Sequence, residues 1–250
     1  MTLLLALFTA AAVLAGPTPT TTPTEPSAAN RLLDGFEAQL VQDPASLRVG
    51  AEYRQLIIET GRYDRSIKLF ERLAHDPRGG ANRYLNLALA NVDKVPVSGS
   101  VRRALLGKEA LDALTHAIAI EPSDLASLIR GLVNLYYDQF VFHRTDKAVA
   151  DLEEARRRAS VHPQIPYMPR ILVALGDGYW RLHQPEKARE VWREGLANWS
   201  SIDGFRVRLN ATDQQLPDII ERALDAGVRV DTTLRELFPD MMSPASKAVP

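Results

Sequence analysis

Small side chains recur along this chain about every forty residues, within segments whose apolar residues have helical spacing. The recurring positions are 44, 38 and 40 residues apart, at Ser66, Ala110, Ala148 and Ala188. A bulky residue stands four positions further on, as in Phe70, Leu114 and Trp192. Small residues let two helices cross closely, and large ones fill the space beside them. A fixed period of this kind predicts a stack of similar helical hairpins.

The apolar pattern indicates an all-α fold. From Ala28 onward, apolar residues recur three and four positions apart, which is the period of a helix with one buried face. The first such stripe predicts a helix at about 30–42, and Asp43-Pro44 ends it. No run of alternating apolar and polar residues with hairpin turns interrupts the helical pattern.

The last repeat carries the most specific motif. Its first helix contains Leu175-Gly176-Asp177-Gly178-Tyr179, and its second contains Ala188 followed after three residues by Trp192. These residues resemble the tetratricopeptide repeat, which has Leu-Gly-x2-Tyr in its first helix and Ala-x3-aromatic in its second. A further repeat spans Tyr53 to Pro77. The resemblance implies a short right-handed solenoid of about four helical hairpins at 29–200, with capping helices at both ends.

The two middle repeats are stretched relative to the family length. Ala88 and Ala110 are 22 residues apart where the last repeat has 12, which indicates about ten extra residues between Asp93 and Leu106. A second, shorter insertion lies between Gly131 and Ala148. We expect both insertions to be loops.

Beyond residue 200 the repeat pattern stops, and a C-terminal helical cap is expected over 201–240. Thr212-x2-Gln215 has the form of a capping box for a helix over 216–224. Asp231 is placed to cap a short final helix that ends at Phe238. A disordered tail is expected at 241–250.

The N-terminal segment predicts export. Leu3 to Leu14 is an apolar run too short to span a membrane, and Val13 and Ala15 are small residues suited to cleavage after Ala15. We therefore expect a signal peptide at 1–15, a Pro/Thr-rich linker at 16–28, and a periplasmic or secreted location. The first charged side chain is Glu25, so Lys and Arg are missing from the leader. An uncleaved short anchor and a misread start remain alternatives.

Seven residues are interpreted as structural. In a subset of tetratricopeptide repeats, an Arg-Gly pair in the first helix faces an Asp in the second, and the resemblance places Arg130 and Asp151 in these positions. A ligand-binding role for Arg130 is the alternative. The close helix crossings are assigned to Gly131, Gly176, Ala110, Ala148 and Ala188.

The family resemblance also predicts where a partner binds. First-helix side chains line the concave groove of such solenoids, which implies contacts by Asp177, Trp180 and Arg181, with Gln55, Glu59 and Asp93 on the same face. Phe140 and Phe142 belong to an aromatic stretch that either fills the core or forms an exposed hot spot. The expected ligand is a protein or peptide.

Composition and motifs limit the kinds of reaction and ligand that the sequence predicts. The sequence has no cysteine, no Gly-rich phosphate-binding loop and no helical His-Glu-x2-His motif, so neither cofactor, metal nor catalytic residues are predicted. A formal net charge of -1 gives no general attraction to nucleic acid. The favoured function is a non-catalytic protein-interaction scaffold or assembly factor outside the cytoplasm. A helical accessory subunit of a partner enzyme is the alternative, and a hydrolase is the least supported.

Overall fold

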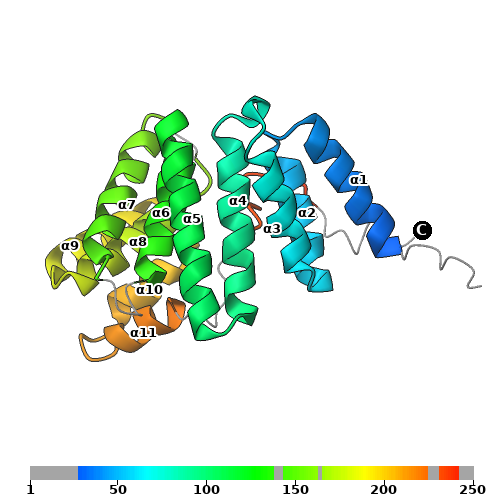
Figure 1. The fold of residues 1–250 in the computed structure, drawn as a ribbon. Coiled ribbons are helices and arrows are strands. Elements are labelled where there is room, and N and C mark those ends of the chain that lie inside the picture. Colours follow the sequence, from blue (N-terminus) through cyan, green and yellow to red (C-terminus); the bar gives the residue numbers. More distant parts are fainter. Residues whose placement is uncertain (1–27, 138–142, 163–164, 225–230, 242–250) are drawn as a thin grey trace, which may run out of the picture.

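The computed structural model describes residues 28–137, 143–162, 165–224 and 231–241. Within these ranges all regular secondary structure is helical, as the apolar pattern predicts (Figure 1). The α-helices are α1 (Ala28–Gln42), α2 (Leu47–Thr60), α3 (Tyr63–Leu73), α4 (Asn82–Lys94), α5 (Ser100–Ile120), α6 (Asp124–Tyr137), α7 (Thr145–Ala159), α8 (Met168–Arg181), α9 (Pro185–Asn198), α10 (Asp203–Asn210) and α11 (Leu216–Ala223). Two short 3-10 helices, η1 (Pro77–Gly79) and η2 (Val95–Val97), follow α3 and α4.

The helices pair into consecutive hairpins that stack side by side (Figure 1). We call the first helix of each hairpin its A helix (α2, α4, α6 and α8) and the second its B helix (α3, α5, α7 and α9). Helix α1 packs against α2 at one end, and α10 packs against α9 at the other. The expected caps are therefore present at both ends of the stack, where they cover apolar faces that would otherwise meet water.

The turn that closes a hairpin has a clear cause in the sequence. After α2, Gly61 adopts a left-handed backbone with φ 69°, and the amide of Arg62 donates to the carbonyl of Ile57. Glycine takes this conformation without a steric penalty from a Cβ atom, which ends one helix and redirects the chain into the next.

The recurring small residues lie where helices of a hairpin meet. Ala110, Ala148 and Ala188 are fully buried. A Cβ atom on Gly131 would lie 2.7 Å from Cγ of Leu152, and one on Gly176 would overlap the indole of Trp192. Glycine at these two positions allows the A helix to approach its B helix closely.

The first insertion is mostly helical, which corrects the expectation of a loop. After η2, α5 begins at Ser100 and runs for 21 residues. Of the ten extra residues, those from Ser100 onward therefore lengthen a B helix.

The C-terminal region also departs from the prediction. Helix α11 is present, and the amide of Thr212 donates to Oε1 of Gln215 over 3.0 Å, which is one half of a capping box. The expected final helix is wrong, because residues 231–241 form turns. Met241, the first residue of the expected disordered tail, is buried at 8% exposure.

Several expectations lie outside the described residues: the signal peptide, the linker up to residue 27, Phe140, Phe142 and the tail beyond Met241. Ala28, placed in the linker, is the first residue of α1. No helix in the described ranges is long and apolar enough to cross a membrane.

The close packing of α8 on α9 predicts that alanine in place of Gly176 destabilises the protein. Gly176→Ala should lower the free energy of unfolding by about 1–3 kcal/mol, because the added methyl group overlaps Trp192. Gly35→Ala in α1 is the matched control, since its Cβ would meet nothing within 4 Å, and it should raise stability by up to about 1 kcal/mol. Urea denaturation measures both, and a stabilised Gly176→Ala protein would contradict the packing.

Candidate functional site

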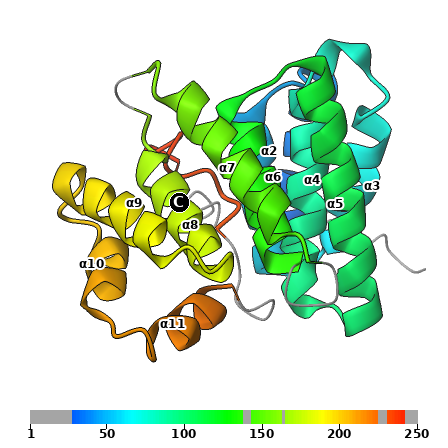
Figure 2. The same cartoon turned by 90° about the vertical axis from the view of Figure 1, so that its left-hand side faces the viewer.

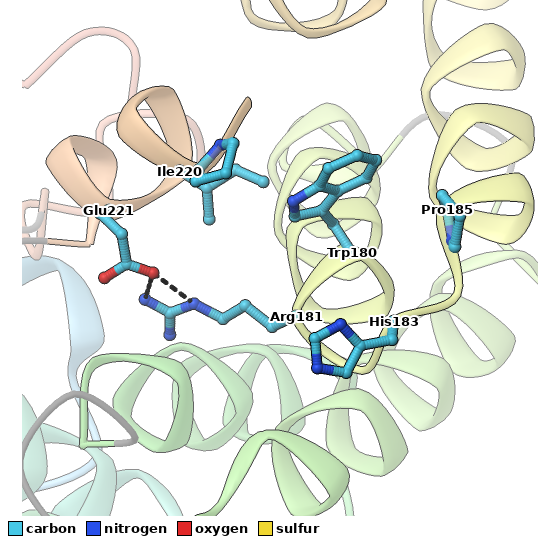
Figure 3. Close-up of a pocket in the computed structure, with 7 residues that line it drawn as sticks. Trp180, Arg181, His183, Pro185, Ile220 and Glu221 are labelled. Carbon is cyan, nitrogen blue, oxygen red and sulfur yellow. Dashed lines mark hydrogen bonds and ion pairs between the residues drawn. The ribbon is translucent and has the colours of Figure 1, made fainter. Parts of the chain in front are cut away.

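A groove of about 540 Å³ opens where α8 ends, and we call it the Trp180 groove (Figure 3). Its lining comes from the end of α8, the following turn, the start of α9, and α11: Trp180, Arg181, His183, Pro185, Pro217, Ile220 and Glu221. The turn has a local cause, because His183 adopts φ 57° and the amide of Gln184 donates to the carbonyl of Tyr179. This left-handed helix ending leaves Trp180 in the last turn of α8, facing the groove.

Arg181 forms one wall of the groove and ties three helices together. Its Nη1 donates to the carbonyl of Leu135 in α6 over 2.7 Å. Its Nε and Nη2 donate to Oε1 of Glu221 in α11 over 3.1 and 2.8 Å. The Arg181 side chain is only 10% exposed, so its main role in this state is to hold α11 beside the groove (Figure 3).

Asp177 lies outside the Trp180 groove and lines a second hollow of the A-helix face, which is described below. Its carboxylate is 3% exposed and receives Nε and Nη2 of Arg208 in α10 over 2.5 and 2.6 Å. Burial raises the pKa of Asp177, and the Arg208 guanidinium opposes that shift. The pair joins the last hairpin to its cap, and no repeat motif in the sequence marks Arg208 as the partner.

The bond that the Arg-Gly pattern predicts between α6 and α7 is present. Nε and Nη2 of Arg130 donate to the two carboxylate oxygens of Asp151 over 2.9 and 2.5 Å. Asn134 adds a third bond to the same carboxylate over 3.0 Å, and Arg144 donates to Asn134 over 2.8 Å. Asp151 thus anchors a network across the hairpin.

The chain's own C-terminal segment, residues 231–241, lies against the A helices, and we call it the strap. Both views show it, coloured red, folded back onto the helices (Figure 1, Figure 2). Its Thr232 and Leu234 are buried at 3% and 2% exposure. The sequence predicts a short helix for this segment, and no repeat motif in it indicates that the segment returns to the A helices.

Arginines from two A helices hold the strap. Arg48 of α2 donates to both carboxylate oxygens of Asp240 over 3.2 and 2.9 Å. Arg170 of α8 donates to the carbonyl of Asp231 over 2.7 Å and lies 3.5 Å from Glu236. The strap therefore links the first hairpin to the last.

A buried contact lies beneath the strap. Arg54 of α2 donates to the carbonyl of Thr232 over 2.8 Å and lies 3.4 Å from Asp93 of α4. Asp93 also accepts a hydrogen bond from the Thr232 hydroxyl. Burial lowers the pKa of Arg54, and the Asp93 carboxylate acts in the opposite direction. Asp93 and Gln55, expected to line an open groove, are covered at 2% and 6% exposure.

Beside the strap the A-helix face keeps a second hollow of about 320 Å³. Its lining includes Leu132 and Tyr136 of α6, Arg170 and Val173 of α8, and Leu224 after α11. Among the described residues, no group of three His, Cys, Asp or Glu side chains is arranged to hold a metal ion. The side chains that line this hollow include arginine, aromatic and aliphatic groups.

Stacked hairpins with small residues at their crossings define a tetratricopeptide-type helical solenoid. Its fold is similar to the crystal structure of a thermophilic TPR protein from Thermus thermophilus, with a TM-score of 0.53 and 21% identity over 72% of this chain and 88% of that one. The MamA protein aligns with a TM-score of 0.46 and 19% identity over 72% of this chain and 85% of that one. No protein-family model matches the sequence, and no curated protein matches it.

The Asp151 network predicts a specific loss of stability. Asp151→Asn should lower the free energy of unfolding by about 1–3 kcal/mol, because it removes the charge that Arg130 and Asn134 face. Asp112→Asn is the control, since its bond to Lys108 is exposed and worth less than about 1 kcal/mol. Equal melting temperatures for the two variants would rule out a structural role for the network.

Proposed function

We propose that this protein is a non-catalytic protein-interaction scaffold, or assembly factor, that acts outside the cytoplasm and binds partner polypeptides on its A-helix face. One observation carries the proposal: this face already binds a polypeptide segment, its own strap, through side chains of α2, α4 and α8. A surface whose side chains form hydrogen bonds and ion pairs with one polypeptide segment can form the same contacts with another. The tetratricopeptide-type fold agrees with this use.

The Trp180 groove is the second contact region of the proposal. Trp180 is partly exposed at the rim, and Ile220 provides an apolar floor across from it. Aromatic side chains at the edge of a hollow supply large contact areas and are frequent hot spots. In this proposal Arg181 holds α11 beside the end of α8 and so keeps the groove in shape.

The location outside the cytoplasm is supported by the apolar run Leu3–Leu14 and by the small residues Val13 and Ala15. We expect the protein in the exported fraction of its host to lack residues 1–15 and to begin at Gly16. Mass spectrometry of intact protein from cell fractions measures this. An intact Met1 on a cytoplasmic product would contradict export and leave the scaffold proposal standing.

Truncation of Trp180 tests the binding surface. Trp180→Ala should weaken capture of partners from the native host roughly thirty-fold, which corresponds to about 2 kcal/mol for a hot-spot residue. Val161→Ala is the control, because Val161 is 71% exposed in the turn after α7 and should capture as wild type does. Circular dichroism must show that both variants stay folded. Undiminished capture by Trp180→Ala would exclude this groove.

A specific surface also favours the alternative, an accessory subunit of a partner enzyme. Val101 and Leu105 are 80% and 47% exposed in the first turns of the lengthened α5, and Val97, the last residue of η2, is 59% exposed. Val101 and Leu105 are four residues apart and share one face of α5, and exposed apolar side chains that lie together mark protein contacts. Under this alternative one enzyme is captured in stoichiometric amounts, Val101→Asp prevents its capture, and Trp180→Ala leaves it unchanged.

A further inference from the structure

The strap crosses the A-helix face as a bound ligand would. It contacts α8 through Asp231, α2 and α4 through Thr232, and α2 again through Asp240. Helices α2 and α8 belong to the first and last hairpins. A single short segment therefore bridges surfaces that the stacking of hairpins alone does not connect.

Charge complementarity runs along this contact. The eleven residues of the strap, Asp-Thr-Thr-Leu-Arg-Glu-Leu-Phe-Pro-Asp-Met, contain three acidic side chains and one basic one. The side chains that meet the acidic groups are Arg48 and Arg170, and Arg48 also lies over the ring of Phe238. An arginine fork matches the geometry of the carboxylates that such an acidic segment presents.

The strap is fastened by side chains. Its backbone-to-backbone hydrogen bonds within the described residues stay inside the strap, as from Leu237 and Phe238 to Leu234 and from Met241 to Phe238. The helices reach it through Arg54, Arg170, Arg48 and Asp93. Leu234 has a left-handed backbone with φ 57°, which a leucine rarely adopts. Such a segment can leave without breaking any helix.

The strap does not provide acceptors for all the hydrogen-bond donors of Arg54. The side chain is 1% exposed, and its Nε and Nη2 have no hydrogen-bond acceptor in the described part of the chain. Buried donors without acceptors are costly, and a guanidinium is well matched to a carboxylate. An occupant that brings a carboxylate to Arg54 would satisfy donors that the Thr232 carbonyl leaves open.

We propose that the strap is an exchangeable self-ligand, and that the partner which displaces it is an acidic segment of another protein. The inference rests on the proposed scaffold function and adds the chemistry of the partner. A tethered segment competes at an effective concentration on the order of millimolar, so the closed face rejects weak ligands. Only a segment that contacts the arginines better than the strap does gains access.

Charge reversal on the strap tests this directly. The probe is a fluorescein-labelled peptide with the sequence of residues 231–241, and its anisotropy is titrated with full-length proteins. Glu236→Lys/Asp240→Lys should bind the peptide at least tenfold more tightly than wild type, because the reversed charges repel Arg48 and Arg170 and open the face. Adding Arg48→Glu/Arg170→Glu should abolish that gain.

The matched control is Glu71→Lys/Asp112→Lys, which changes the net charge equally on exposed positions of B helices α3 and α5. It should bind the peptide as weakly as wild type does. Equal affinity of the strap variant and this control would overturn the proposal. The scaffold proposal would survive that result if partner capture still depended on Trp180, so the two failures are distinguishable.

Hydrogen exchange of the wild-type protein gives an independent test that needs no variant. The amides of Leu237 and Phe238 should exchange at least a hundredfold faster than core amides of α8, because the strap opens without global unfolding. Equal protection of strap and α8 would show that the strap is an integral part of the fold and would overturn the proposal.

Discussion

The buried contact among Arg54, Asp93 and Thr232 is the interaction that positions the strap on the A helices. Taking a guanidinium and a carboxylate out of water costs several kcal/mol for each ion, and the loss is offset only when both ions meet well-placed partners. Here the ions come from neighbouring A helices, and Thr232 comes from a segment 139 residues beyond Asp93. The hairpin stack and the C-terminal segment therefore stabilise each other, and the open groove expected of a solenoid is partly closed.

The sequence predicts the features that depend on local spacing. Gly176 with Trp192, and Gly131 with Leu152, lie where the repeat motif requires close helix packing. The Arg130–Asp151 bond follows from the same motif. Each of these contacts joins the two helices of one hairpin, so a short pattern along the chain is enough to specify it.

Contacts between distant segments could not be predicted in this way. Asp177 stands at a position expected to face a ligand. Its ion-pair partner is Arg208 of α10, and no motif in the sequence indicates where α10 packs. The strap is a stronger case, because its local pattern predicts a short helix and its role comes from meeting Arg48 and Arg170 in space. The helical extension of α5 could not be predicted for another reason: residues in excess of a family length do not themselves specify loop or helix.

The central claim is that the A-helix face is a polypeptide-binding surface that the strap occupies. Spin labels at Glu71→Cys and Arg235→Cys test it most directly by double electron–electron resonance, since the chain has no native cysteine and both positions are exposed. We predict one narrow distance distribution in the otherwise wild-type protein and a broad one when Glu236→Lys/Asp240→Lys is added. A broad distribution in the first protein, or an unchanged narrow one in the second, would contradict the claim.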